Sequence, residues 1–220
     1  YIREVAEHSS IPVISLQDDV DHPCQSIADL MTIREKFGTN LRGMKFVISW
    51  TYAPAYARPL SVPQGLITLM PRFGMDVTLA HPKEFNLMPR TLEAAKKYAK
   101  ESGSKFEVVH DMDASFKNAV VLYPKSWGCH QYLEDQGVPE ADRKTIGMGL
   151  INKYKKWVCT EKRMKLGKKN AVYMHPLPAD RGAEVEDAVI DGPQSIVFDQ
   201  AENRLHTVKA ISALTMGGRP

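Results

Sequence analysis

The 220-residue sequence is poor in cysteine and lacks the glycine-rich signatures of nucleotide-binding proteins. Its three cysteines, Cys24, Cys129 and Cys159, lie far apart without paired metal-ligand spacing, which argues against a disulfide framework and a zinc site. No Gly-x-Gly-x-x-Gly turn follows the first apolar run and no Gly-Lys-Ser/Thr loop occurs, so dinucleotide and nucleotide-triphosphate binding lose support. We therefore expect no cofactor, no metal and a reducing compartment, the cytoplasm.

Long apolar runs and a strong charge of either sign are also missing. No stretch approaches the roughly 20 apolar residues of a membrane span, and the first four residues show no signal-peptide core. The net charge of +3 suits a small anionic substrate but is too diffuse for a nucleic-acid footprint. The basic stretch at residues 162–169 is interpreted as a solvated helix face. We expect neither a nucleic-acid nor a membrane partner.

Apolar segments of strand length alternate with segments of helical periodicity. Strands are predicted at residues 44–50, 75–80, 106–109, 119–123, 171–174 and 196–198. Helices are predicted at about residues 23–37, 63–73, 91–102, 112–118, 160–166 and 201–216, and residues 147–149 are interpreted as a turn. Continuously apolar strands between helices predict an α/β fold with a parallel sheet flanked by helices.

Unusual loops follow three of the predicted strands. Residues 51–65 contain three prolines and carry Arg58 and Ser61, and a long loop of this kind is more often functional than filler. Residues 124–128 and 175–180 follow two later strands. Because ligands of parallel sheets bind beyond the carboxyl ends of the strands, we expect the site at these loops.

A polar pair stands at the start of the helix predicted from Pro23. Proline is favoured at the first helical position, and it places His22 and Gln25 one turn apart at the same helix end. Gly38 supplies a stop signal. Taken alone, the four residues His22-Pro23-Cys24-Gln25 are more typical of a capped helix that carries two incidental polar side chains.

Three motifs in order resemble the aspartate/ornithine carbamoyltransferase family. They are His22-Pro23-Cys24-Gln25, His175-Pro176-Leu177-Pro178 and the segment from Asp199 to Thr207. Residues 49–54, 59–65 and 123–127 resemble a knotted branch of that family, akin to the acetyl- and succinylornithine enzymes. The resemblance covers essentially the whole chain and implies a Rossmann-like second-substrate domain with a knot through the proline-rich loop.

The resemblance implies transfer of the carbamoyl group from carbamoyl phosphate to the amino group of a small amine or amino acid, with release of phosphate. His22 and Arg204 would donate hydrogen bonds to the carbonyl oxygen as it gains negative charge. Gln25 and the backbone carbonyls of Pro176 and Leu177 would orient the carbamoyl NH2 group. Orientation and electrostatics would provide the catalysis without a covalent intermediate. For Arg204, an ion pair with Glu202 is the structural alternative.

The second substrate would contact His175, Lys125, Trp127 and Asp180. Lys125-Ser126-Trp127 stands where ornithine enzymes carry Ser-Met-Gly, and Pro176 stands where they carry cysteine, which argues against ornithine. Asp180 lies near the place where aspartate enzymes have an arginine, so we expect it to contact an amine or ammonium group. Core packing of Trp127 and a backbone bond of His175 stay open as alternatives.

The family's Ser-x-Arg-Thr phosphate-binding segment finds no match in residues 1–21. We therefore predict that residues 1–33 are the end of a carbamoyl-phosphate-binding domain whose remainder is missing. Residues 34–195 would form the amine-binding α/β domain, and residues 196–220 a final strand and helix that return to the first domain. The resemblance also implies a homotrimer with shared sites. The alternative is a non-catalytic metabolite- or anion-binding α/β module.

Overall fold

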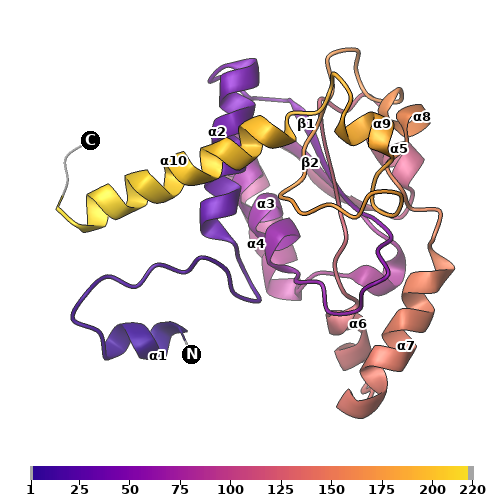
Figure 1. Ribbon diagram of the computed structural model, residues 1–220, viewed down its shortest axis with the longest axis horizontal. Helices are drawn as coiled ribbons and strands as arrows, with labels where there is room; N and C mark the ends of the chain where they lie inside the picture. Colours follow the sequence, from indigo (N-terminus) through magenta and orange to yellow (C-terminus); the bar gives the residue numbers. More distant parts are fainter. Residues whose placement is uncertain (1, 218–220) are drawn as a thin grey trace.

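A five-stranded parallel sheet forms the centre of the computed structural model, which describes residues 2–217 (Figure 1). Residue 1 and residues 218–220, at the ends of the predicted first and last segments, lie outside the described residues. The strands are β1 (Lys45–Trp50), β2 (Asp76–Ala80), β3 (Phe106–Val109), β4 (Val121–Lys125) and β5 (Val172–Tyr173). Their order is β3-β2-β1-β4-β5 and every pair is parallel. The predicted α/β fold with a parallel sheet is confirmed.

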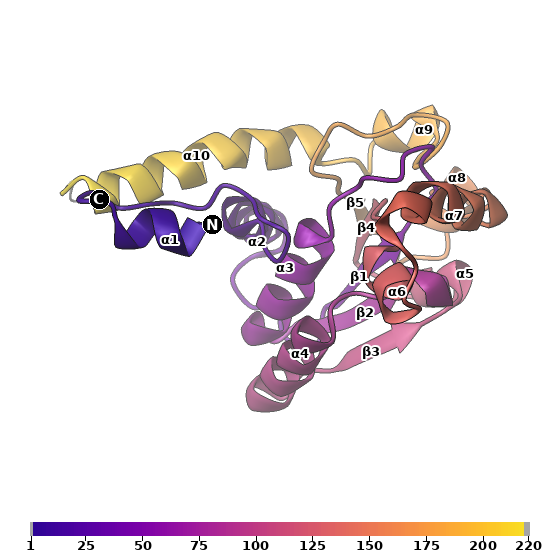
Figure 2. The same ribbon diagram turned by 90° about the horizontal axis from the view of Figure 1, so that it is seen from below.

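Helices cover both faces of the sheet (Figure 2). On one face, Phe46, Ile48 and Tyr123 pack in a core with α2 (Pro23–Phe37), α3 (Ser61–Leu69) and α4 (Pro89–Ser102). On the other face, Val47 and Leu122 pack with α5 (Met112–Phe116), α8 (Glu161–Met164) and α9 (Asp187–Ile190). Successive strand residues point to opposite faces of the sheet. Because helices cover both faces, the central strands carry apolar residues at almost every position.

Short elements complete the chain. The 3-10 helices are η1 (Met70–Phe73) and η2 (Lys83–Phe85), and the remaining helices are α1 (Ile2–Glu7), α6 (His130–Asp135), α7 (Glu140–Lys153) and α10 (Val197–Thr215). In Figure 1, α1 lies apart from the sheet at the end of an extended segment. β4 ends at Lys125, two residues later than predicted, so the predicted loop residue Lys125 closes the strand instead.

Two predicted elements are wrong. The strand predicted at residues 196–198 is instead the start of α10. Ile196 donates its N–H to the Tyr173 carbonyl oxygen at 3.1 Å, and the helix begins at the next residue, so no strand can continue along the sheet. The turn predicted at residues 147–149 lies inside α7. Gly147 admits the ring of Tyr56 there, since a Cβ would stand 2.5 Å from Tyr56 Cδ2. That glycine therefore serves close packing rather than a turn.

The last helix packs across α2. Asn203 Nδ2 donates to Thr32 Oγ1 at 3.0 Å and to Glu35 Oε2 at 2.6 Å, and Thr207 Oγ1 donates to the Cys24 carbonyl at 3.3 Å. Figure 1 shows α10 running from the sheet past α2 towards α1. This packing brings Arg204, from the end of the chain, to the start of α2.

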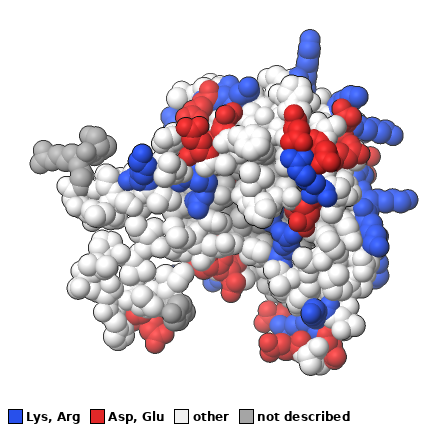
Figure 3. Space-filling view, in the orientation of Figure 1, with Lys and Arg blue, Asp and Glu red and all other residues white. Residues whose placement is uncertain are grey.

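Charge is mixed over the face shown in Figure 3, where Lys and Arg project beside Asp and Glu without a continuous field of one sign. Lys162, Lys165 and Lys169 are exposed, and Arg163 pairs with Asp113 at 2.6 Å.

No helix among residues 2–217 is long and apolar enough to cross a bilayer.

Candidate functional site

The loops after β1, β4 and β5 meet where the strand order reverses. β1 and β4 are neighbours, and the strands continue outward from them in opposite directions, which creates the crevice that binds ligands in open α/β sheets. Trp50 Nε1, at the end of β1, donates to the Trp127 carbonyl at 2.8 Å. The Ser126 N–H, after β4, donates to Glu184 Oε1 at 2.7 Å. Of the residues predicted from the sequence, Gln25, His175 and Asp180 are linked to these loops by hydrogen bonds through Asp29, Gln200 and Glu184.

Gln25 belongs to a buried hydrogen-bond network that centres on Asp29. Asp29 Oδ1 accepts from Gln25 Nε2 at 2.7 Å and from Gln200 Nε2 at 2.6 Å, while Asp29 Oδ2 accepts from the Tyr123 hydroxyl at 2.9 Å. Gln200 Oε1 in turn accepts from the His175 N–H at 2.9 Å. With its NH2 group held by Asp29, Gln25 keeps its carbonyl oxygen free of hydrogen bonds from residues 2–217.

Asp29 is fully buried and its ionisation is strongly perturbed. Burial raises the pKa of Asp29 to about 7, against the opposing effect of the hydrogen bonds from Gln25, Gln200 and Tyr123 and of the Arg204 charge. Burial, followed by the charge of Asp29, raises the pKa of Tyr123 well above its usual value, so that Tyr123 stays a donor. Sequence reasoning did not single out Gln200 or Tyr123, the other two partners of Asp29. Asp29 one turn after Gln25 was the only available signal.

His22 and Arg204 each place an unpartnered nitrogen near the start of α2. His22 Nδ1 and Arg204 Nη1 are buried and have no hydrogen-bond partner among residues 2–217. Burial, and then the charge of Arg204, lowers the pKa of His22 to about 4, so the imidazole is neutral at pH 7 and carries one N–H. Glu202, the alternative partner of Arg204, contacts His206 at 3.6 Å instead. Buried polar groups without partners are rare, and these two lie close enough for the Arg204 charge to act on the imidazole.

The His175-Pro176-Leu177-Pro178 segment forms a strained loop after β5. Leu177 has a φ of +42°, in the left-handed region that side chains other than glycine seldom occupy. Its N–H donates to His175 Nδ1 at 3.1 Å. The carbonyls of Pro176 and Leu177 accept no hydrogen bond from the part of the chain that the structure describes. Strain of this kind concentrates at functional sites.

Glu184 joins the loops on the other side of His175. Glu184 is fully buried; its Oε1 accepts from the Ser126 N–H at 2.7 Å, and its Oε2 accepts from the Asp180 N–H at 2.9 Å. His175 Nε2 lies 3.4 Å from Glu184 Oε1, and Lys125 Nζ donates to the Ser126 carbonyl at 3.1 Å. Sequence reasoning missed Glu184, because no local pattern marks a carboxylate that is buried by distant loops.

These contacts set the charges of the buried groups. Burial by itself would raise the pKa of Glu184, but the hydrogen bond and charge of His175, the Lys125 charge and the Asp180 N–H hold it well below its usual value. Burial lowers the pKa of His175, which Lys125 and Arg58 lower further. Burial also lowers the pKa of Lys125. Glu184 is therefore the anion that balances the cations of this loop cluster.

Asp180 and Trp127 already have protein partners. The Asp180 carboxylate forms an ion pair with Arg58 of the proline-rich loop. An amine that reaches Asp180 would therefore share that carboxylate with a guanidinium. Trp127 is 1% exposed and its indole N–H donates to the Phe85 carbonyl at 2.9 Å. Trp127 lies in the hydrophobic core, which agrees with the alternative that this side chain serves packing. There it holds the loop after β4 in place.

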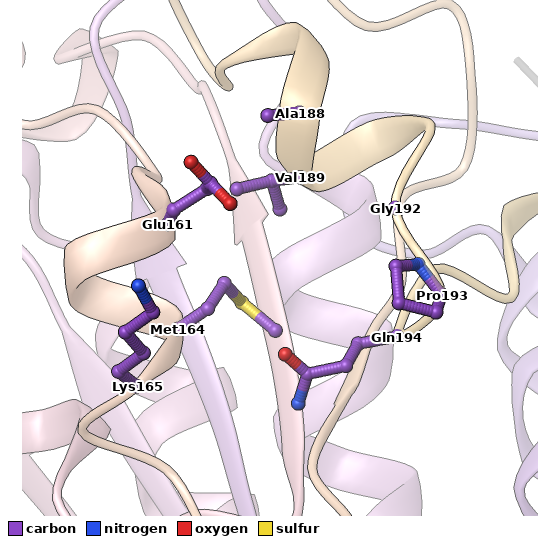
Figure 4. A pocket seen from close by; sticks show the side chains of 8 residues that line it. All are labelled: Glu161, Met164, Lys165, Ala188, Val189, Gly192, Pro193 and Gln194. Atoms are coloured by element: carbon purple, nitrogen blue, oxygen red, sulfur yellow. The ribbon is translucent and has the colours of Figure 1, made fainter.

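Other features of the chain lie away from this crevice. A cavity of about 130 Å³ opens between α8 and α9, where Glu161, Lys165 and Gln194 line it (Figure 4). It contains none of the residues predicted for the site. Among residues 2–217 no group of three His, Cys, Asp or Glu side chains could hold a metal ion. The three cysteines are free and buried.

Comparison with known sequences finds a family whose arrangement matches the chain. The Asp/Orn binding domain of aspartate/ornithine carbamoyltransferase matches residues 60–215, and the carbamoyl-P binding domain of the same family matches residues 1–35. A putative carbamoyltransferase, YgeW, of Escherichia coli K12 is 39% identical over 218 residues, which cover 90% of this chain and 54% of that protein. An N-acetylornithine carbamoyltransferase of Xanthomonas campestris is 37% identical, with 98% of this chain and 61% of that protein covered.

Solved structures agree with the sequence comparison. Acetylornithine transcarbamylase complexed with acetylcitrulline superposes with a TM-score of 0.87 at 36% identity, over 97% of this chain and 61% of that one. A mutant N-acetyl-L-ornithine transcarbamylase complexed with carbamyl phosphate and N-succinyl-L-norvaline gives a TM-score of 0.87 at 37% identity, over 97% and 62% of the two chains. The chain thus spans between about half and two thirds of the length of these relatives. The chain belongs to the aspartate/ornithine carbamoyltransferase family.

Proposed function

We propose that this chain carries the second-substrate half of a carbamoyltransferase. The intact protein would transfer the carbamoyl group of carbamoyl phosphate to the amino group of a small amine or amino acid and release phosphate. The pair of buried, unpartnered nitrogens at the start of α2, His22 Nδ1 and Arg204 Nη1, is the observation that carries this proposal. A related transcarbamylase that binds carbamyl phosphate, with the same fold over this length, supports it.

The two donors suit the charge that develops in carbamoyl transfer. The amine nitrogen attacks the carbonyl carbon, whose oxygen becomes negative; the C–O bond to phosphate then breaks and phosphate leaves with the electron pair. The proton of the attacking amine leaves with it. A neutral imidazole N–H and a guanidinium would stabilise that oxygen. Because neither group has a protein acceptor, no other hydrogen bond must break first.

Acceptors for the carbamoyl NH2 group stand opposite these donors in the proposal. The amide oxygen of Gln25 is the first, since the Gln25 NH2 group is held by Asp29 at 2.7 Å. The carbonyls of Pro176 and Leu177 are the others, held by a loop that proline stiffens on both sides of Leu177. Gln200 couples the two sets, because it bonds both Asp29 and the His175 N–H. Their shared network fixes all the acceptors relative to one another.

The proposal places the second substrate against the loops after β4 and β5. Lys125 and Arg58 supply cations, Asp180 and Glu184 supply carboxylates, and His175 lies between them. A site with both signs of charge suits an amine that also carries an acidic group, such as an amino acid. Trp127 contributes by holding the loop through its bond to the Phe85 carbonyl.

The organisation of the whole protein is part of the proposal. Residues 1–33 would end a carbamoyl-phosphate-binding domain, residues 34–195 would bind the amine, and residues 196–220 would return to the first domain. The packing of α10 on α2 supports that return, although its first residues are helical rather than a strand. A homotrimer with shared sites, a knotted chain and a cytoplasmic location complete the proposal; three free, buried cysteines suit a reducing compartment.

Phosphate release from carbamoyl phosphate, measured on the intact protein with a panel of amines and amino acids, tests this function. We expect release that depends on one class of amine, together with a carbamoylated product of the same amine. Gln25→Ala and Arg204→Ala should each weaken carbamoyl phosphate binding, whereas Lys96→Ala, an exposed lysine on α4, should leave it unchanged. Binding without release across the whole panel would favour the non-catalytic module.

A further inference from the structure

A second groove lies between helices α2, α3 and α4, on the face of α2 that Gln25 does not occupy. α3 packs against both α2 and α4, as Figure 2 shows, and forms the floor of a cavity of about 450 Å³. Gly65 and Thr68 line it from α3, Ser26 from α2, and Ala94 and Tyr98 from α4. A volume of this size accommodates a small metabolite.

Two guanidiniums without a carboxylate partner stand at the rim of this groove. Arg72 follows α3 and its Cζ atom lies 4.3 Å from the ring centroid of Tyr98. Arg90 begins α4, and its one polar contact is with Met88 Sδ at 3.8 Å. Neither arginine forms an ion pair with any carboxylate among residues 2–217. Guanidiniums that are free of acidic partners bind carboxylate and phosphate groups in two-point contacts.

The inner end of the groove carries a buried hydroxyl and a carboxylate. Ser26 is 4% exposed, and its Oγ atom has no hydrogen-bond partner among the described residues. The half-buried Asp21 carboxylate accepts from the His22 N–H at 2.6 Å and keeps further acceptor capacity. A Cβ on Gly65 would lie 2.4 Å from Asp21 Oδ1 and 2.5 Å from Ser26 Oγ. Both side chains therefore turn toward the floor of the groove, and the absence of a side chain at position 65 makes room for them.

We propose that this groove binds a small metabolite that carries a carboxylate or phosphate group and, at its other end, an amino group. Arg72 and Arg90 hold the anionic group, Tyr98 forms an apolar wall, and Asp21 accepts the amino N–H. The site is separate from the crevice above the sheet, because Pro23, Ser26 and Ile27 line the groove while Gln25 and Asp29 face Tyr123 and Gln200. The proposal does not depend on carbamoyl transfer.

Calorimetric titration of the intact protein tests this proposal with two probes that share an amino group and differ in the anion, L-glutamate and O-phosphoethanolamine. We expect at least one to bind, and the one that binds more tightly identifies the anionic group. Loss of a charged hydrogen bond should weaken that binding by about tenfold or more in Arg72→Gln and in Arg90→Gln. Lys96→Gln removes an exposed cation of α4 outside the groove and should leave binding unchanged.

A variant that keeps both arginines distinguishes loss of binding from loss of folding. Ala94→Trp fills the groove and should abolish binding while the melting temperature stays near that of the wild type, since Ala94 is partly exposed. Arg204→Gln, in the crevice, should leave binding of the probe intact. The proposal is overturned if neither probe binds, if binding survives all three groove substitutions, or if Arg204→Gln alone removes it.

Discussion

Asp29 accepts a hydrogen bond from Gln25 at 2.7 Å, one turn back along the same helix, and this contact decides which end of the Gln25 amide faces the crevice. The same carboxylate binds Gln200, which reaches it from the far end of the chain. A buried acid thus organises the first and last motifs of the sequence into one site.

Asp29→Asn tests the raised pKa of this carboxyl group. The folded-state pKa of about 7 lies above the ordinary value of 3.8, so the folded protein binds the proton more tightly. The resulting stabilisation is complete below about pH 4 and is lost as the pH rises through about 7. The stability of the wild type relative to Asp29→Asn should therefore fall between about pH 4 and pH 7 and level off above that range, measured by urea unfolding. A constant difference for Asp29→Asn over this range would contradict the raised pKa.

Replacement of His22 by Ala should lower the kcat of the proposed carbamoyl transfer in a protein that still folds. Removal of one preorganised donor to a developing oxyanion costs about 10²–10³ in kcat. His206→Gln, on the same helix as Arg204 but in contact with Glu202, is the matched histidine control and should retain activity. Steady-state kinetics of the intact protein measures both. Equal kcat values for His22→Ala and the wild type would exclude His22 as a donor to the reacting oxygen.

Glu184→Ala should destabilise the fold strongly. The change leaves the N–H groups of Ser126 and Asp180 without their acceptor and Lys125 without its nearby anion. Breaking a buried charge pair from one side costs about 3–5 kcal/mol. Glu134→Ala, at an exposed position of α6, should change the free energy of unfolding by no more than about 0.5 kcal/mol. Similar urea midpoints for the two variants would show that Glu184 does not hold the loops.

Two helical glycines give opposite predictions. Gly65→Ala places a methyl group 2.4 Å from Asp21 Oδ1 and 2.5 Å from Ser26 Oγ, so these two side chains must move, at a cost of about 1–3 kcal/mol. Gly149→Ala, in α7, meets no atom within 4 Å and should stabilise by about 0.4–1 kcal/mol through the unfolded chain. Melting temperatures of the two variants should move in opposite directions. A Gly65→Ala protein as stable as the wild type would mean that the Asp21 and Ser26 side chains move away without cost.

Sequence patterns located the sheet better than the shorter helices. The central strands β1, β2 and β4 carry largely apolar runs, which burial on two faces requires, so composition alone marks them. Residues 196–198 carry the same signal over too few residues to distinguish a strand from a helix start. The sequence analysis did not predict α7, because Gly147 and Gly149 are typical of a turn. In the structure Gly147 lies inside the helix, where it packs against Tyr56.

The motifs themselves determined the family and named His22, Gln25, Arg204 and the loop at Leu177, because those residues are close to one another in sequence or carry a recognisable local pattern. Only the tertiary structure decided how they are held. Asp29, Gln200 and Glu184 are ordinary polar residues until folding buries them; burial gives each its partners and sets the charge state of the two acids. Contacts between residues 171 positions apart, such as Asp29 and Gln200, leave no local trace in a sequence, since they arise from the packing of the last helix on the first motif.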